Sequence, residues 1–268
     1  MSQATIGRFN VRVIGSGDTT LVLAHGFGAS QHVWEHQVSA FRQTCRIVLF
    51  DHIGCAANDA ADNDLANFSS LDFHRDNILA IYDALNLQRT VFVGHSVSSM
   101  LGVAVYLARP ELFERMIFVA GSPCYLNTDN YLGGFSRDEL NRLYSSMAAD
   151  YFKWANGFGK AVSANPGCPS LGEFFAGKLS SMRPDVAQLV ARAIFELDYR
   201  AHLENVGLPV LILQAHNDLA VPEQVGRYLH DKLPDSRLVL LDAEGHLPQL
   251  SAPEQVNQAI RAFLETGS

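Results

Sequence analysis

Short apolar runs alternate with helical patterns along most of the 268-residue chain. Several of these runs are continuously apolar, as expected for strands that are covered on both faces. The runs are residues 9–15, 20–26, 45–51, 90–96, 115–121, 208–214 and 236–242. Apolar positions with helical spacing predict helices at residues 71–85, 223–233 and 254–264. Because strands alternate with helices, the pattern predicts an α/β fold, with a mostly parallel sheet flanked by helices.

The alternation stops between residues 123 and 200, where four helical segments replace the strands. Pro184 predicts the start of one helix, residues 149–158 predict another, and two more begin at capping boxes. Three pairs have capping-box spacing: Ser136 with Glu139, Ser170 with Glu173, and Ser251 with Glu254 before the last helix. The region is rich in aromatic residues, more than four short helices can bury among themselves. We therefore expect a helical lid of residues 123–200, inserted after the sixth strand, over a core formed by residues 1–122 and 201–268.

Composition and charge narrow the range of partners. The formal net charge of −8 argues against nucleic acid or an anionic membrane as the main partner. The first residues do not resemble a signal peptide, and no apolar stretch approaches the ~20 residues that cross a bilayer. The four cysteines have no C-x-x-C spacing, so we expect reduced thiols and a cytoplasmic protein. His32 and His36 have spacing compatible with a metal, but no third ligand is evident, and a solvated helix face explains them better.

A strand-to-helix junction at residues 91–102 carries the first candidate for chemistry. Gly94-His95-Ser96 joins the run "VFVG" to a helical pattern that begins at Val97. A serine at such a turn has its hydroxyl exposed at the carboxyl end of a strand, beside a helix amino terminus. The G-x-S-x-G pattern is incomplete because Ser98 replaces the second glycine, although serine is among the smallest alternatives. A buried serine ahead of a core helix is the competing interpretation, and the motif alone does not decide between the two.

Two later loops offer the partners that a nucleophilic serine needs, a base and an acid that orients it. Asp218 follows the strand "PVLILQ", and His246 follows the strand "RLVLLD". The chain order is thus serine, acid, histidine, as in hydrolases with this kind of junction. Asp242 is a rival acid, but it belongs to the strand that leads to His246. We predict a triad of Ser96, Asp218 and His246, with no cofactor and no metal.

The segment "HGFG", residues 25–28, completes a site for acyl transfer. Two backbone N–H groups are needed to stabilise the oxyanion that forms during such a reaction. Val97, directly after the serine, offers one, and Phe27 in the glycine-flanked loop offers the other. The sequence thus predicts an oxyanion hole at Phe27 and Val97, with the Phe27 ring beside the pocket.

These motifs resemble the α/β-hydrolase superfamily, and within it the branch of the bacterial stress-response regulator RsbQ and the plant karrikin and strigolactone receptors. The resemblance extends almost end to end. It rests on the segments "LAHGFGASQHVW", "GHSVSSMLG", "SPCYLN", "YLGGF", "RPDVA", "DLAVPEQV" and "GHLPQLS". "GHSVS" without the second glycine looks typical of the receptor side of that branch, so Ser96 keeps its interpretation as a nucleophile. The loop at residues 51–64 departs from the commoner D-x-x-G-x-G pattern, which indicates a different partner for that surface.

Members of this branch are slow ester or lactone hydrolases that also act as signalling proteins. The resemblance implies a four-helix lid over an aromatic pocket, a small apolar ester or butenolide-like lactone as ligand, and a signalling protein that docks on the lid. Matching positions imply these pocket residues: Phe27, Tyr125, Phe135, Trp154, Phe158, Phe175, Phe195 and Leu219.

Other functions use the same triad and stay open. One is a plain metabolic carboxylesterase, and another is a carbon–carbon bond hydrolase. The second is weaker because the lid offers Arg137, Arg142 and Lys153 but no evident anion-binding cluster. Haloalkane dehalogenases and epoxide hydrolases are disfavoured, since their chemistry uses an aspartate where Ser96 stands.

Overall fold

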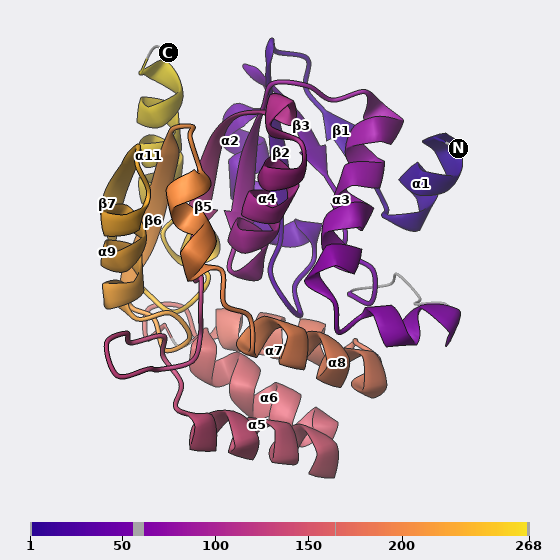
Figure 1. Cartoon of the computed structure of the whole chain (residues 1–268), viewed down its shortest axis with the longest axis vertical. Helices are drawn as coiled ribbons and strands as arrows, with labels where there is room; N and C mark the ends of the chain where they lie inside the picture. Colours follow the sequence, from indigo (N-terminus) through magenta and orange to yellow (C-terminus); the bar gives the residue numbers. More distant parts are fainter. Residues whose placement is uncertain (1, 56–61, 164, 267–268) are drawn as a thin grey trace.

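A seven-stranded sheet with the order β1-β3-β2-β4-β5-β6-β7 forms the centre of the protein. The computed structural model describes residues 2–55, 62–163 and 165–266 (Figure 1). The strands are β1 Arg12–Ile14, β2 Thr19–Ala24, β3 Cys45–Leu49, β4 Thr90–His95, β5 Phe113–Val119, β6 Val210–Asn217 and β7 Ser236–Glu244. Neighbouring strands are parallel except β1 and β3, which are antiparallel. The predicted fold class is confirmed; residues 56–61, where the loop departs from the family pattern, lie outside the described residues.

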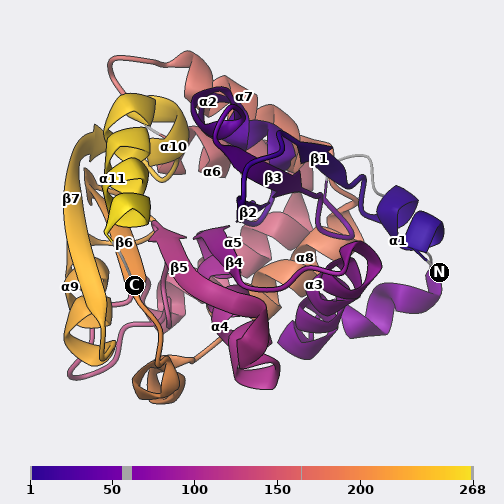
Figure 2. The same cartoon turned by 90° about the horizontal axis from the view of Figure 1, so that it is seen from above.

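Helices cover both faces of the sheet. Seen from above, α2 and α11 lie on one face, and α3, α4 and α9 lie on the other (Figure 2). All six residues of β4 are buried as a result, which explains why this run is apolar without alternation. The core helices are α1 Ser2–Arg8, α2 Glu35–Phe41, α3 Leu71–Leu85, α4 Val97–Ala108, α9 Glu223–Lys232, α10 Pro248–Ser251 and α11 Pro253–Glu265. Short 3-10 helices are η1 Gln31–Trp34, η2 Asp62–Asn67, η3 Pro110–Leu112 and η4 Arg200–Asn205.

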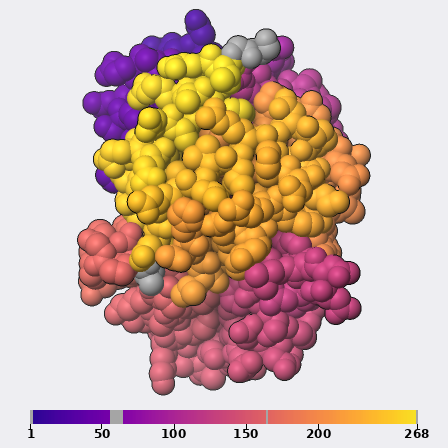
Figure 3. All heavy atoms as spheres, turned by 90° about the vertical axis from the view of Figure 1, so that its left-hand side faces the viewer, coloured from indigo at the N-terminus to yellow at the C-terminus, as the bar shows by residue number. Residues whose placement is uncertain are grey.

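Four further helices lie between β5 and β6 and cover one end of the sheet (Figure 1). They are α5 Arg137–Ala149, α6 Tyr151–Val162, α7 Ser170–Ser180 and α8 Pro184–Phe195. We call residues 123–200 the helical insertion. It follows the fifth strand rather than the predicted sixth, because the run at residues 115–121 that precedes it is β5, the fifth described strand in chain order. Seen from the side of β7, α9 and α11, the insertion fills the lower end of the molecule (Figure 3).

The predicted helix starts are only partly correct. At α5 the capping box is present, with the Ser136 N–H donating to Glu139 Oε2 (2.8 Å) and the Glu139 N–H to Ser136 Oγ (3.3 Å). At α7 and α11 the boxes are absent: the N-cap residues are Pro169 and Ala252, and neither makes a side-chain cap. The predicted cap of α11, Ser251, instead ends α10 and donates its hydroxyl to the Glu244 carbonyl (3.3 Å). At α11, Pro253 at the first helical position sets the backbone for the first turn without a side-chain cap.

Three features of the described residues bear on other kinds of site. Among residues 2–55, 62–163 and 165–266, no helix is both long and apolar enough to cross a membrane. Within the same ranges, no three His, Cys, Asp or Glu side chains are grouped as metal ligands would be. The four cysteines are free.

Candidate active site

Ser96 occupies a tight turn between β4 and α4. Its φ of 57° and ψ of −127° are strained for a residue with a side chain, as expected where a serine is held out of a strand-to-helix junction. The Ser96 N–H donates to the Val119 carbonyl (2.9 Å), which fastens the turn to β5. A Cβ at Gly94 would lie 2.6 Å from backbone atoms of Ser98, so only glycine allows α4 to pass this close.

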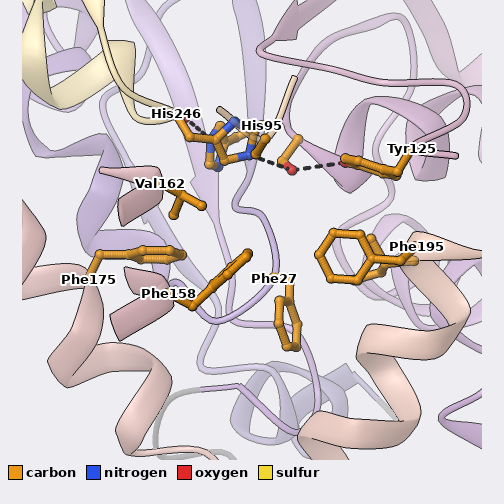
Figure 4. A pocket seen from close by; sticks show the side chains of 11 residues that line it. Phe27, His95, Tyr125, Phe158, Val162, Phe175, Phe195 and His246 are labelled. Atoms are coloured by element: carbon orange, nitrogen blue, oxygen red, sulfur yellow. Dashed lines mark hydrogen bonds between the residues drawn. The ribbon is translucent and has the colours of Figure 1, made fainter. Parts of the chain in front are cut away.

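A continuous chain of hydrogen bonds joins Ser96, His246 and Asp218 (Figure 4 shows its serine end). Ser96 Oγ lies 2.9 Å from His246 Nε2, and His246 Nδ1 lies 2.8 Å from Asp218 Oδ2. The other carboxylate oxygen accepts the N–H groups of Ala220 (2.8 Å) and Val221 (3.0 Å). Because the carboxylate only accepts, His246 carries its proton on Nδ1, and Nε2 is free to accept the serine proton. Each of the three side chains is buried.

Asp242, the rival acid, takes no part in this chain. It is exposed on β7, and its backbone N–H donates to Gln255 Oε1 (3.0 Å). The geometry therefore brings together the predicted serine, histidine and acid, and leaves the rival outside.

The loop that carries His246 is fastened at three points by its backbone. The His246 N–H donates to the Val162 carbonyl at the end of α6 (2.8 Å), and the His246 carbonyl accepts from His95 Nε2 (2.8 Å). The Gly245 N–H donates to the Asn217 carbonyl at the end of β6 (2.8 Å). His246 is thus positioned jointly by β4, β6 and the helical insertion.

The predicted oxyanion donors flank the serine. A Cβ at Gly26 would lie 2.9 Å from Ser96 Cβ, so the glycine lets this loop pack directly against the serine. Phe27 follows in the same loop, and its N–H makes no hydrogen bond to any described residue. Val97 is the first residue of α4, where helix geometry leaves the N–H without an intrahelical acceptor. Both N–H groups are therefore free to bind a developing negative charge.

A narrow cavity opens at Ser96, with a volume of about 30 Å³, room for about two water molecules. Five predicted pocket residues line it: Phe27, Tyr125, Phe158, Phe175 and Phe195 (Figure 4). Four residues that the sequence did not single out as lining also contribute: His95, Val162, Ile194 and Ala220. They lie in a strand, two helices and a loop, and these positions carry no periodic signal that separates a cavity wall from ordinary core.

Three predicted pocket residues lie elsewhere. Trp154 stacks on Phe158 (ring centroids 5.0 Å apart) and Phe135 packs against Phe195 (5.3 Å), so both form a second layer behind the wall. Leu219 is 65% exposed and borders an open surface hollow that includes Glu223. The Asp218 carboxylate holds its own loop through the next residues, and this turn directs the Leu219 side chain outward.

Tyr125 touches the serine directly, which the sequence did not indicate. Its hydroxyl lies 3.1 Å from Ser96 Oγ (Figure 4). Burial raises the pKa of Tyr125 well above its ordinary value, so the phenol keeps its proton. Since the Ser96 hydroxyl donates to His246, the Tyr125 hydroxyl donates to Ser96.

A second serine–histidine pair lies beneath the site. His52 Nε2 is 2.9 Å from Ser98 Oγ and 3.0 Å from the His25 carbonyl, and the Ser98 hydroxyl donates to that same carbonyl (2.5 Å). A carbonyl oxygen accepts only, so His52 carries its proton on Nε2 and cannot deprotonate Ser98. Ser98 is also fully buried, outside the cavity that Ser96 lines. The missing second glycine of the motif thus supplies an internal hydrogen bond.

Four buried histidines share one electrostatic property. Desolvation lowers the pKa of each below its ordinary value, and most strongly for two of them, so that all four are neutral near pH 7. We call them the neutral histidines: His25, His52, His74 and His95.

A family model, curated relatives and solved structures all relate this chain to the same family. A family model described as the alpha/beta hydrolase fold matches residues 19–253. "Strigolactone esterase D14" of Arabidopsis thaliana is 41% identical and covers 98% of this chain and 99% of its own. "Karrikin insensitive 2 receptor CA" of Petunia hybrida is 40% identical, over 92% of each chain. Among solved structures, a hydrolase from Oleispira antarctica has a TM-score of 0.95 at 29% identity, over 99% of this chain and 98% of that one. The resemblance drawn from the motifs is confirmed on its plant-receptor side.

Proposed function

The chain belongs to the α/β-hydrolase fold family, and from that premise we propose that it is a serine hydrolase of small apolar esters or lactones. We further propose that turnover is slow and that the protein senses its ligand for a signalling partner. Relatives named as a strigolactone esterase and a karrikin receptor, at about 40% identity over nearly the whole chain, support hydrolase chemistry and kinship with receptors.

The reaction uses only side chains and backbone groups of this chain. Ser96 Oγ attacks the carbonyl carbon while His246 Nε2 takes the hydroxyl proton. The N–H groups of Phe27 and Val97 bind the oxyanion, and Asp218 stabilises the imidazolium. Collapse of the intermediate breaks the ester C–O bond, and the leaving alcohol takes the proton from His246. Water, deprotonated by His246, then releases the acid from Ser96; a lactone yields a hydroxy acid.

The observation that carries this proposal is the hydrogen-bonded chain from Ser96 through His246 to Asp218 at the wall of an apolar cavity. The pair of Ser98 and His52 lacks each of these properties. It has no carboxylate on the histidine, its histidine proton is on the wrong nitrogen for a base, and its serine does not reach the cavity.

The test is a matched pair of serine variants. Ser96→Ala is expected to lower turnover of a short activated ester by a factor of about 10⁶, the usual cost of losing a triad serine. Ser98→Ala removes a hydroxyl two positions away and is expected to retain most of the turnover. Mass spectrometry of the wild-type protein treated with a phosphonate should find the adduct on Ser96. Undiminished turnover in Ser96→Ala would refute the nucleophile assignment.

The size of the cavity supports the sensing part of the proposal. The cavity has room for about two water molecules, fewer than the heavy atoms of a substituted lactone ring, so a ligand of that size displaces aromatic side chains of the helical insertion. Phe158 and Phe195 pack on Trp154 and Phe135, which carry such a displacement into α5–α8. A ligand shifts the insertion only as far as it binds one packing better than another. The loaded protein then presents a changed surface on residues 123–200.

Affinity capture from the native organism tests this second part. Capture of a signalling protein should depend on a phosphonate-loaded Ser96 and should fall in Arg142→Glu on α5. Arg89→Glu, an equally drastic change at an exposed arginine of the core, is the matched control. Rapid turnover of a common metabolite with no captured partner in either state would instead identify a metabolic carboxylesterase.

A further inference from the structure

A second apolar cavity adjoins the one at Ser96. It lies between the loop after β3, the first turns of α3 and α4, and α8, with a volume of about 20 Å³. Its walls are Gly26, Phe27, His52, Ile53, Cys55, Leu71, His74, Val97, Leu101, Val190 and Ile194. Phe27 and Ile194 line both cavities, so these two side chains form the partition between them. The Phe27 ring stands at the edge of the first cavity, away from Ser96 (Figure 4).

Among the described residues of its wall, two histidine rings and one thiol are the polar side chains. His52 donates from Nε2 to the His25 carbonyl (3.0 Å), and His74 donates from Nε2 to the Phe68 carbonyl (3.2 Å). Both rings are neutral because burial lowers their pKa values, so each Nδ1 is an unprotonated acceptor. Neither Nδ1 has a hydrogen-bond partner among the described residues. Cys55, whose pKa burial raises to about 12, is a neutral thiol in the same wall.

We propose that this cavity is a subsite for the distal end of the ligand, and that it selects an apolar group that carries a hydroxyl. The inference rests on the proposed function for the reacting end of the same molecule. Two unpaired acceptors in an apolar wall favour a group that donates a hydrogen bond. They disfavour a ketone, an ether or a carboxylate, which can only accept or would bring a charge into an apolar site.

The partition explains how one ligand reaches both cavities. Neither cavity alone holds more than about two water molecules, and rotation of the Phe27 ring would join them. Phe27 also carries a proposed oxyanion N–H, so its backbone stays fixed while its side chain moves. A ligand with its ester at Ser96 can then extend past Phe27 toward His52 and His74. The preferred substrate is therefore an ester or lactone with a hydroxylated apolar extension.

The first experiment compares two substrates that differ in one terminal group. The para-nitrophenyl esters of heptanoic acid and ω-hydroxyhexanoic acid have the same chain length and end in methyl or hydroxyl. Wild-type kcat/KM should favour the hydroxyl ester by about twofold to tenfold, the range expected for one neutral hydrogen bond. A merely apolar pocket would favour the methyl ester, because it would desolvate the hydroxyl without a partner.

Two variants of matched size locate the effect. Val190→Phe fills the second cavity and should reverse the preference, whereas Val162→Phe narrows only the first cavity and should retain it. His74→Phe removes one of the two acceptors at nearly constant volume and should lower the preference, and His74→Gln should restore part of it. The ratio of the two substrates cancels general damage to the enzyme. A wild-type ratio below one, or a ratio unaffected by Val190→Phe and His74→Phe, would overturn the inference.

A binding measurement separates this inference from the hydrolase proposal. In Ser96→Ala protein with nitrogen-labelled histidine rings, isopropanol should shift the Nδ1 resonances of His52 and His74, whereas acetone, of similar size but without a donor, should not. Equal shifts with both probes, or no shift with either, would refute the subsite even in an active hydrolase. Absence of any ester hydrolysis in the wild type would refute the proposed function and leave the probe result standing.

Discussion

Replacing Asp218 by asparagine tests how much turnover depends on which ring nitrogen of His246 carries the proton. The two side chains have the same shape, so the amide oxygen of the new side chain can still accept the N–H groups of Ala220 and Val221 and hold the loop. The amide nitrogen, however, replaces the oxygen that accepts from His246 Nδ1 at 2.8 Å. The amide donates, so Nδ1 must become the acceptor and the histidine proton moves to Nε2. That nitrogen then faces Ser96 Oγ as a donor and cannot take the serine proton.

The expected loss is about 10⁴ in kcat, which corresponds to roughly 5 kcal/mol of activation free energy. Stability should change little, by about 1 kcal/mol or less, because the loop's own hydrogen bonds survive. The assay is steady-state hydrolysis of para-nitrophenyl acetate, together with urea unfolding of each variant. Asp242→Asn, the same chemical change at an exposed residue, should leave both kcat and stability near wild type. A loss below tenfold for Asp218→Asn, or a larger loss for Asp242→Asn, would refute the assignment of the acid.

Three further predictions follow from the packing and the buried groups. Gly94→Ala should destabilise the protein by about 2 kcal/mol in urea unfolding, because the new Cβ would lie 2.6 Å from the α4 backbone. Gly157→Ala on α6, where a new Cβ meets no atom, should instead stabilise the protein by about 0.5–1 kcal/mol. Phe195→Leu should raise KM about threefold to tenfold without slowing phosphonate labelling of Ser96, and Leu219→Ala should leave KM unchanged. The neutral histidines have folded pKa values below 6.5, so only the unfolded chain takes up their protons as pH falls below about 6.5. The unfolding free energy should therefore drop as the pH falls from about 6.5 to 5, chiefly through His52 and His95, whose pKa values are lowered most; a flat profile would contradict their buried, neutral state.

The sheet was predictable because it is covered on both faces. Full burial makes each parallel strand continuously apolar. Such a strand can therefore be predicted from its own sequence, without knowing which strands lie beside it. The capping-box spacing predicted a helix start correctly where all the interacting groups lie within one turn, as at Ser136 and Glu139. It failed at Ser251, because the Glu244 carbonyl, which lies before α10, binds the hydroxyl that the capping box required.

The three residues of the hydrogen-bonded chain were predictable because topology alone brings them together. Each follows a parallel strand, and the carboxyl ends of such strands meet at one edge of a sheet. The cavity wall was harder to predict, because a ring in the insertion can face the cavity or stand behind another ring. Trp154 and Phe158 are four positions apart on α6 and stack on each other, yet only Phe158 reaches the cavity. Which ring lies in front depends on how α6 packs against its neighbours.

The least predictable feature is the backbone anchoring of His246, since its partners come from distant segments. The His95 side chain binds the His246 carbonyl, and the Val162 carbonyl binds the His246 N–H. His95 adjoins Ser96, so the first bond holds the histidine in reach of the serine. Val162 ends α6, so the second bond makes the helical insertion part of the same support. A movement of α6 away from the core must break that bond or carry the histidine loop with it. The geometry of the reacting groups and the position of the insertion are thus linked by one backbone hydrogen bond.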